Sequence, residues 1–289
     1  MRIIEDLKEM RECAGKSRSL GLKVVFVPTM GYLHDGHREL LRIGKKSGVL
    51  LVLSIFVNPA QFGPKEDFNS YPRDIERDLK IAEEEGVDVV FTPRATDMYP
   101  EGYRTYVEAG VLGERLCGAS RPGHFKGVAT VVLKLFNLVK PDAAIFGKKD
   151  YQQLLIIRKM VRDLDLDIEI IGAETVREPD GLAMSSRNRY LSPEEREAAR
   201  CVPEAIAAAK AAFSAGVKDA SVLTGKMKKI IEKQPRAAID YLRVCDKESL
   251  EDLDKIETEG LAALAVKVGP VRLIDNSVLE KGAHGSIRV

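Results

Sequence analysis

Two histidines, a lysine and a serine–arginine run carry the chemistry that this sequence can perform. His34 and His37 stand three residues apart in HDGH, Lys149 stands in GKKD, and Ser185 to Arg187 form the run SSR. Imidazole, ammonium, hydroxyl and guanidinium groups all donate hydrogen bonds to phosphate oxygens. Nothing near them has the pattern of a protein nucleophile with its base. These residue types indicate alignment and charge stabilisation, as phosphoryl or nucleotidyl transfer requires.

The HDGH segment stands where a predicted strand gives way to a predicted helix. Val24 to Val27 is a short, β-branched apolar run, which is typical of a buried parallel strand. Pro28 is expected to end that strand, because proline cannot donate to a sheet ladder. A helix is expected from His37 onward. Phosphate groups bind well at such a helix N-terminus, and Gly36 would let a ligand approach closely.

HDGH alone leaves three other interpretations open. It could be a surface turn with two exposed histidines, a zinc site, or part of a dinucleotide-binding fold. None of the four cysteines stands in CxxC spacing, which disfavours zinc. No GxGxxG follows the strand, which disfavours the dinucleotide fold.

Further polar residues follow other predicted strands. Val49 to Val57 predicts a second buried strand, after which come Asn58 and Gln61; the strand predicted over 143–146 precedes GKKD. The carboxyl ends of parallel strands meet at one edge of a sheet, where ligands bind. A turn at 121–124 carries Arg121 and His124, which could face an anion or lie on the surface.

The alternation of strands and helices predicts an α/β fold. We expect a helical segment over 2–20, helices over 73–85, 127–139 and 151–163, strands over 87–91 and 167–171, and an irregular stretch over 92–123. Together these indicate a Rossmann-like parallel sheet with helices on both faces.

The composition changes after a loop over 177–189. Ser192 is predicted to cap a helix, Pro203 to kink or split it, and strands are expected over 239–245, 261–268 and 271–274. The predicted domains are therefore 1–176, which is catalytic, and 177–289, a smaller α+β domain covering the active site.

Bulk properties narrow the class of protein. The 289 residues carry 45 Lys and Arg against 44 Asp and Glu, so the net charge of +1 does not favour nucleic acid or an anionic membrane as partner. The longest apolar run is too short to span a bilayer, and acidic residues stand where a signal peptide would be apolar. Four scattered cysteines favour a reduced, cytoplasmic protein.

Several longer motifs resemble one family. In order, FVPTMGYLHDGH, SIFVNPAQFG, YPRD, RPGHF, KLFNLVKP, FGKKD, VREPDGLAMSSRN and LIDN look like pantoate–β-alanine ligases, within the wider HxGH nucleotidylyl-transferase superfamily. The resemblance runs over nearly the whole chain. It implies the condensation of pantoate with β-alanine at the expense of ATP, giving pantothenate, AMP and pyrophosphate through a pantoyl adenylate. It also implies Mg²⁺ on the nucleotide phosphates and a homodimer.

The resemblance also implies roles for single residues. His37, the family's usual candidate general acid, with His34, Lys149 and Arg187, would be catalytic, and Gln61 would also contact β-alanine. The pantoate site would comprise Gln61, Gln153, Asn58, Arg121 and His124. The ATP site would comprise Met30, Gly31, Tyr32, Leu33, His34, Asp35, Gly36, His37, Gly147, Lys148, Lys149, Asp150, Val176, Met184, Ser185, Ser186 and Arg187. The loop over 177–190 is expected to close over a water-labile adenylate.

Two departures from the family pattern lie near these residues. Lys148 stands where the family commonly has glutamine, so a second cation could tighten phosphate binding or partly substitute for Lys149. Lys126 replaces a common arginine.

Two other functions remain open at this point. Another adenylyl or cytidylyl transferase of the superfamily would keep HxGH but need not keep Gln61 together with Gln153. A non-catalytic nucleotide-binding regulator would not require His37, Lys149 and Arg187 together.

Overall fold

The computed structural model describes residues 1–64 and 66–280, and the chain divides into two compact units. The first unit comprises Met1–Val176 and Met184–Ser186. The second comprises Arg177–Ala183 and the described residues from Arg187 onward. The chain therefore passes between the units three times within the loop that follows Val176.

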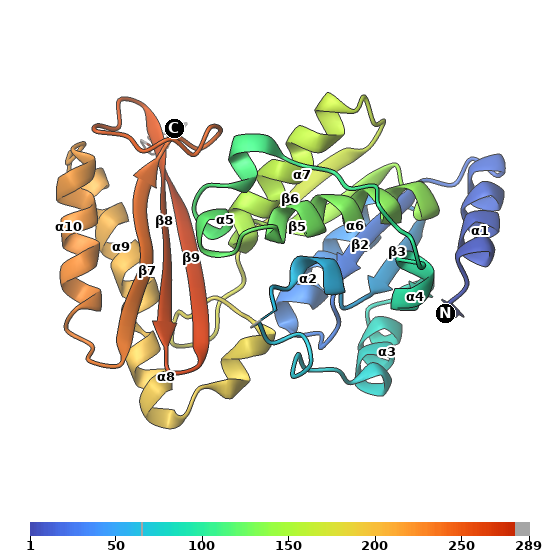
Figure 1. The fold of residues 1–289 in the computed structure, drawn as a ribbon, viewed down its shortest axis with the longest axis horizontal. Coiled ribbons are helices and arrows are strands. Elements are labelled where there is room, and N and C mark those ends of the chain that lie inside the picture. Colours follow the sequence, from blue (N-terminus) through green and yellow to red (C-terminus); the bar gives the residue numbers. More distant parts are fainter. Residues whose placement is uncertain (65, 281–289) are drawn as a thin grey trace, which may run out of the picture. The chain divides into compact units, whose positions relative to one another are not determined.

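The first unit is built on a sheet whose strand pairs are all parallel in the described part of the chain (Figure 1). The strand order is β1-β4-β3-β2-β5-β6. The strands are β1 (Arg2–Ile4), β2 (Val24–Thr29), β3 (Leu50–Ile55), β4 (Val89–Phe91), β5 (Ala143–Gly147) and β6 (Glu169–Ala173). The predicted α/β class is confirmed.

Helices cover both faces of this sheet, because successive strand residues point to opposite sides. Val25 of β2 packs in one apolar cluster with Leu41 and Ile81, from the helices after β2 and β3. Phe26 meets the ring of Phe136 at 6.4 Å on the other face. The helices are α1 (Leu7–Ser19), α2 (Asp35–Ser47), α3 (Ile75–Glu84), α4 (Ala95–Met98), α5 (Cys117–Ser120), α6 (His124–Val139) and α7 (Tyr151–Asp163). Short 3-10 turns span Pro59–Gln61 (η1), Gly110–Gly113 (η2) and Lys148–Asp150 (η3).

Several predicted boundaries in this unit were wrong. The segment 2–20 is not wholly helical, because Arg2–Ile4 forms β1 and pairs with β4 at the edge of the sheet. A strand of three residues has too short a pattern to separate from the first turn of a helix. The stretch 92–123 contains α4, η2 and α5, and α2 begins at Asp35 instead of His37.

Pro28 does not end β2, which continues to Thr29. Neighbouring residues of a strand direct their N–H and C=O groups to opposite sides. The Thr29 carbonyl accepts from Phe56 N on the β3 side, so Pro28 is directed toward β5. Pairing with β5 stops at Phe26, two residues earlier. The missing N–H of Pro28 therefore costs no ladder hydrogen bond.

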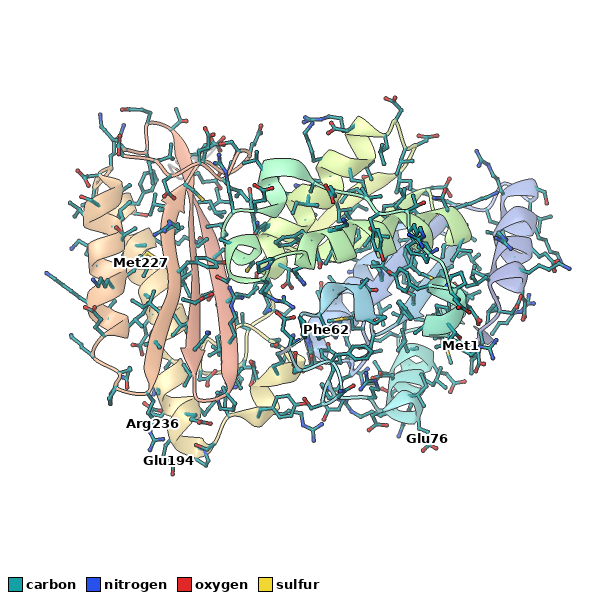
Figure 2. All side chains as sticks on the ribbon, in the orientation of Figure 1. Met1, Phe62, Glu76, Glu194, Met227 and Arg236 are labelled. Atoms are coloured by element: carbon teal, nitrogen blue, oxygen red, sulfur yellow. The ribbon has the colours of Figure 1, made fainter. Side chains whose placement is uncertain are left out.

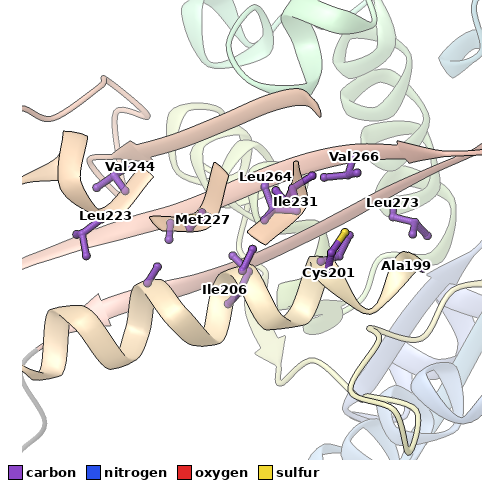
Figure 3. Packing of buried hydrophobic residues seen from close by; sticks show 14 of the residues in the cluster. Ala199, Cys201, Ile206, Leu223, Met227, Ile231, Val244, Leu264, Val266 and Leu273 are labelled. Atoms are coloured by element: carbon purple, nitrogen blue, oxygen red, sulfur yellow. The ribbon is translucent and has the colours of Figure 1, made fainter. Parts of the chain in front are cut away.

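The second unit is a three-stranded antiparallel sheet with helices packed on it, as an α+β class predicts (Figure 1). Its core combines Ile206, Leu223 and Met227 of the helices with Leu264 and Val266 of the central strand (Figure 3). The elements are α8 (Pro193–Ala199), α9 (Cys201–Ser214), α10 (Ala220–Ile231), β7 (Ala237–Cys245), β8 (Glu259–Val268) and β9 (Val271–Glu280), and a 3-10 turn, η4, spans Ser186–Tyr190.

Two local predictions in this unit are confirmed. Ser192 caps α8: its hydroxyl accepts from Glu195 N at 3.2 Å, and the Glu195 carboxylate accepts from Ser192 N at 2.9 Å. Helices α8 and α9 separate at Arg200, which leaves Pro203 in the first turn of α9. Proline is tolerated there, because the first N–H groups of a helix have no partner within it.

Within the described part of the chain, no helix is both long and apolar enough to cross a membrane.

Candidate active site

The motifs HDGH and GKKD follow two neighbouring strands at the point where the sheet changes direction. From β2 the chain proceeds to β3 and β4 on one side, and from β5 it proceeds to β6 on the other. Pairing between β2 and β5 stops at Phe26 and Ala144, although the strands run on to Thr29 and Gly147. Open α/β sheets bind ligands at this switch point, just past the carboxyl ends of the strands.

The HDGH turn places two imidazole rings against each other at the start of α2. His34 is the N-cap residue, and its backbone N–H donates to Nδ1 of His37 at 3.3 Å. The ring centroids lie 4.0 Å apart. A Cβ on Gly36 would lie 2.8 Å from Cε1 and 2.9 Å from Nδ1 of His34, so only glycine leaves room for that ring. The two rings and the helix N-terminus together form a group of hydrogen-bond donors for an anion.

The charge state of His37 follows from its surroundings. Burial lowers the pKa of His37 well below its ordinary value, and electrostatic interactions with His34 and Lys149 lower it further. The ring is therefore neutral at pH 7, and its Nδ1 accepts a hydrogen bond. The proton of the neutral ring must then sit on Nε2, so that His37 presents an N–H donor to a ligand.

Lys148 and Lys149 occupy the same turn but have different surroundings. Lys149 has a side chain 20% exposed and is close enough to His37 to affect its pKa. Lys148 has a side chain 40% exposed and forms an ion pair with Glu174, just after β6. Of the two lysines, Lys149 is thus the one whose charge acts on the HDGH turn.

Replacing Lys148 with glutamine is expected to change kcat by less than about threefold. Its ion pair with Glu174 is exposed, and such pairs contribute roughly 0–1 kcal/mol. Steady-state kinetics with saturating substrates provide the measurement. A fall in kcat as large as that caused by removing Lys149 would contradict this distinction between the two lysines.

The loop after β3 fixes the orientation of one amide side chain through another. Figure 2 draws the side chains on the ribbon and labels Phe62, the residue of this loop that follows Gln61. Asn58 Oδ1 accepts from Ala60 N at 3.3 Å, and Asn58 Nδ2 donates to the carbonyl of Gly127 at 3.1 Å. These backbone contacts leave Asn58 Nδ2 to donate to Gln61 Oε1 at 3.0 Å. The amide nitrogen of Gln61 consequently points away from Asn58, toward Met30 Sδ at 3.1 Å.

Asn58 itself is 0% exposed, and Tyr99 donates a further hydrogen bond of 2.8 Å to its Oδ1. Its donor and acceptor groups are all engaged within the protein. The geometry favours a supporting role for Asn58, in which it directs the Gln61 N–H groups to a ligand, over the direct pantoate contact expected from the sequence.

Arg121 and His124 form a network beneath the same loop. Arg121 donates two hydrogen bonds of 2.6 Å to the two carboxylate oxygens of Glu66 and a third, of 3.1 Å, to His124 Nε2. His124 Nδ1 then donates to the carbonyl of Gln61 at 2.8 Å. The guanidinium thus binds a carboxylate of the protein, which favours a role in holding Gln61 over direct binding of a substrate anion.

The free energy of unfolding is expected to fall by about 3 kcal/mol between pH 6.5 and 4 because of His124. Burial and the charge of Arg121 lower the pKa of His124 to about 4, against an ordinary value of 6.5. Over this range the unfolded chain binds a proton that the folded chain does not, so stability decreases as pH decreases. His124→Asn retains a donor toward the Gln61 carbonyl and does not titrate.

Denaturant unfolding of both proteins at several pH values tests this expectation. The free energy of His124→Asn should depend less steeply on pH than that of the wild type. Equal slopes would contradict the assigned protonation state of His124.

The first part of the MSSR segment lies on the first unit. Met184 N donates to the Val176 carbonyl at 3.0 Å, and a Cβ on Gly36 would lie 3.6 Å from that of Met184. The buried hydroxyls of Ser186 and Tyr71 are 3.1 Å apart. Val176 and Met184 to Ser186 are thus brought to the HDGH turn. Arg187 belongs to the second unit, and its place in the site stays a prediction.

Gln153 and its neighbour Gln152 lie on different faces of α7. Gln152 is buried and accepts from Cys117 N at 3.0 Å, and it donates to the carbonyls of Leu112 and Arg115. Gln153 is only partly buried. The neighbouring glutamine thus anchors the segment before α6, which leaves Gln153 as the one suited to a ligand.

Three residues of the site were not singled out from the sequence. Tyr71 and Glu66 hold the Ser186 and Arg121 side chains, and Asp78 accepts hydrogen bonds from the turn that precedes HDGH. The YPRD motif that contains Tyr71 could have drawn attention to it. Glu66 and Asp78 have no such pattern, because their partners lie far away in the sequence.

Among residues 1–64 and 66–280 there is no group of three or more His, Cys, Asp or Glu side chains arranged to hold a metal ion. The side chains around the HDGH turn are mostly donors and cations, whereas Mg²⁺ prefers oxygen ligands. Such a site fits a metal ion that is held by phosphate oxygens and water.

Known proteins are similar to this chain over nearly its whole length. The model of the family described as pantoate-beta-alanine ligase matches residues 2–278. The pantothenate synthetase of Geobacter sulfurreducens is 54% identical over 96% of this chain and 99% of its own. That of Desulfatibacillum aliphaticivorans is 55% identical over 97% of this chain and 100% of its own.

Solved structures show the same similarity. The pantothenate synthetase of Thermus thermophilus superimposes with a TM-score of 0.91 at 44% identity, covering 96% of this chain and 99% of that one. The pantoate-beta-alanine ligase of Francisella tularensis, solved with beta-gamma ATP and beta-alanine, gives a TM-score of 0.79 at 35% identity, covering 98% and 99%. On these grounds the chain belongs to the pantoate-beta-alanine ligase family.

Proposed function

We propose that this protein joins pantoate to β-alanine at the expense of ATP, giving pantothenate, AMP and pyrophosphate. The observation that carries the proposal is the pairing of the HDGH turn with Lys149 at the switch point of the sheet, in a chain of this family. A site rich in N–H donors and cations, in a sequence without the pattern of a protein nucleophile and its base, suits a reaction in which one substrate attacks another directly.

The first step forms the adenylate. A carboxylate oxygen of pantoate attacks the α-phosphorus of ATP, and the bond from that phosphorus to the leaving pyrophosphate breaks. A carboxylate is a weak nucleophile toward an anionic phosphate, so positive charge must offset their repulsion. Lys149 supplies that charge. His34 and His37 lie at the start of α2 and donate hydrogen bonds to the phosphate oxygens, His37 through its Nε2–H.

The second step forms the amide. The amine of β-alanine attacks the acyl carbon of the adenylate, a C–N bond forms, and the C–O bond to AMP breaks. The amine gives up one proton to the solvent. The reaction needs no covalent bond to the protein, which agrees with the lack of a nucleophile–base pair in the sequence.

Pantoate binding is assigned to two glutamines, Gln61 of the loop after β3 and Gln153 of α7. The Gln61 amide nitrogen is directed away from Asn58, so it donates to an oxygen of pantoate. Gln153 supplies a second amide from α7. Asn58, Arg121 and His124 act by holding Gln61, and Gln61 also lies beside the β-alanine amine.

The ATP phosphates also bind Mg²⁺ in this proposal. The ion would be held by phosphate oxygens and water, and Asp150, the carboxylate of the GKKD turn, is the candidate for a protein ligand. It would supply charge stabilisation on the triphosphate. The nucleotide site further includes Gly147 to Asp150, Val176 and Met184 to Arg187.

We further propose that the protein acts as a homodimer in the cytoplasm. The four cysteines are scattered in the sequence, and Cys117, Cys201 and Cys245 are buried, which suits a reducing compartment. Sedimentation of the purified protein tests the dimer.

The activity is tested in two stages with purified protein, ATP and Mg²⁺. Pantoate alone should release pyrophosphate, and later addition of β-alanine should release AMP and pantothenate. Pyrophosphate release that depends on a different acceptor would favour another nucleotidylyl transferase. Binding of ATP with no release of pyrophosphate, whichever acceptor is added, would favour a regulator.

A further inference from the structure

The turn that leads from β2 to HDGH has an unfavourable backbone conformation. Gly31 has φ +80° and Tyr32 has φ +51°. Glycine adopts the left-handed region freely, but for a bulky residue such as tyrosine it costs roughly 1–2 kcal/mol. Such a conformation persists only where the surroundings hold it in place. Something outside the turn must therefore stabilise residues 31 to 33.

Asp78 of α3 binds two consecutive amides of this turn. Its Oδ2 accepts from Tyr32 N and its Oδ1 from Leu33 N, both at 2.7 Å. Asp78 is 1% exposed. A Cβ on Gly31 would lie 2.9 Å from Asp78 Oδ2, so the carboxylate fits closely beneath the turn. One carboxyl group, with an oxygen for each N–H, satisfies two buried donors that have consecutive positions in the chain.

The position of His34 depends on these contacts. Leu33, whose amide Asp78 holds, precedes His34 directly and is 0% exposed in the core. The next amide, that of His34, donates to His37 Nδ1 and so fixes which nitrogen of His37 carries the proton. Asp78 is therefore one residue away from the hydrogen bond that sets the tautomer of His37.

Helix α3, which carries Asp78, is fastened to the helix that HDGH begins. Arg38 of α2 donates to Glu84 at 2.7 Å and to Glu85 at 2.9 Å, and Arg42 donates to Glu85 at 2.8 Å. Helix α3 and its C-cap, Glu85, thus contact the chain on both sides of HDGH. Asp78 binds the turn before it, and the ion pairs bind α2 after it. Arg38 binds Glu84 as well as Glu85, so this fastening does not depend on Glu85 alone. The side chain of α3 that binds the amides of the turn is Asp78.

We propose that Asp78 is a positioning residue, which holds residues 31 to 33 so that His34 and His37 meet ATP with their N–H groups in the productive arrangement. This inference rests on the proposed function and adds to it a residue that need not touch a substrate. It also implies that the amides of Tyr32 and Leu33, being bound to Asp78, are not the ones that contact phosphate.

The first test compares Asp78→Asn with the matched control Glu85→Gln. Each change replaces a carboxylate of α3 or its C-cap by an amide of similar shape, but Glu85 binds side chains of α2 and no amide of the turn. Asparagine can accept from one N–H and presents its own N–H groups to the other. We expect kcat for pantoate-dependent pyrophosphate release to fall about 100-fold in Asp78→Asn, with a smaller change in KM, and to stay near wild type in Glu85→Gln.

The second test does not depend on activity. The chain has four histidines, so the ring nitrogens can be followed by NMR in the protein without ATP. The His37 ring resonances should shift in Asp78→Asn but not in Glu85→Gln, whatever the outcome of the assay. A folded Asp78→Asn variant with wild-type kcat and wild-type His37 resonances would overturn the proposal.

If Asp78→Asn does not fold, Asp78→Glu takes its place. It keeps the charge but moves the carboxylate by one methylene, so a lower kcat and a shifted His37 signal are again expected. Wild-type behaviour of a folded Asp78→Glu variant on both measurements would overturn the proposal equally. Inactivity of the wild type itself would instead contradict the proposed function and leave the NMR result to decide the positioning role.

Discussion

Replacing Lys149 with alanine is expected to lower kcat for pantoate-dependent pyrophosphate release about 1,000-fold. The Lys149 ammonium is the cation of the GKKD turn that is close enough to His37 to lower its pKa. Negative charge moves onto the leaving pyrophosphate as the pantoate carboxylate approaches, so the charge of Lys149 stabilises the transition state more than bound ATP. Because of this difference, kcat and kcat/KM should fall together.

Two variants serve as controls for Lys149. Lys149→Arg keeps the charge but replaces a compact ammonium by a planar fork, so it should recover only part of the rate. Lys148→Gln removes a positive charge from the same turn and should have little effect. Pyrophosphate release within about fivefold of wild type in Lys149→Ala, measured at saturating ATP and pantoate, would contradict this role.

The second large effect is expected at His37, where replacement with asparagine should lower kcat roughly 100- to 1,000-fold. Asparagine can accept the hydrogen bond from His34 N in place of Nδ1, but it has no donor at the position of Nε2. Glutamine places an N–H group near the Nε2 position. His37→Gln should therefore retain more activity than His37→Asn if His37 acts mainly by donating a hydrogen bond.

The pH dependence gives an independent test of the same role. The pKa of His37 lies well below 6.5 in the free protein, so the ring stays neutral from about pH 6 to 8. The profile of kcat/KM for ATP reports groups of the free enzyme and should show no ionisation of His37 in that range. A drop in kcat/KM with a midpoint near 6.5 that His37→Gln abolishes would show that the ring titrates normally.

The sequence predicted which segments approach one another, because that depends on the order of strands and turns. The carboxyl ends of parallel strands meet, so HDGH after β2 and GKKD after β5 could be assigned to one edge without knowing any contact. The large helices and strands followed from apolar periodicity. Strand β1 was not predicted, because Arg2–Ile4 is too short to show the alternation of apolar and polar residues typical of a strand. Its pairing with β4 also depends on residues that are distant in the sequence.

The orientation of individual side chains could not be predicted from the sequence. Lys148 and Lys149 are chemically alike and adjacent, and only the position of Glu174 after β6 distinguishes them. The resemblance to the family implied that Asn58 and Arg121 belong to the pantoate site. In the structure the donors of these side chains meet the Gly127 carbonyl and Glu66, which no local pattern reveals.

Asp78 illustrates the same limit. In the sequence it is one of several acidic residues of an amphipathic helix, where an exposed position is the ordinary expectation. It is buried because it accepts hydrogen bonds from two backbone amides of a distant turn, one of which, Leu33 N, is 45 residues away in the sequence. A conformation such as that of Tyr32 cannot be inferred from residue types, because tyrosine disfavours it.

The most direct measurement follows an oxygen atom from pantoate into the nucleotide product. Pantoate labelled with ¹⁸O in its carboxylate is incubated with the protein, ATP, Mg²⁺ and β-alanine, and the products are analysed by mass spectrometry. Attack on the α-phosphorus followed by cleavage of the acyl C–O bond places one ¹⁸O in AMP and none in pyrophosphate. Label found in inorganic phosphate, with ADP formed in place of AMP, would show attack on the γ-phosphorus and contradict the adenylate mechanism.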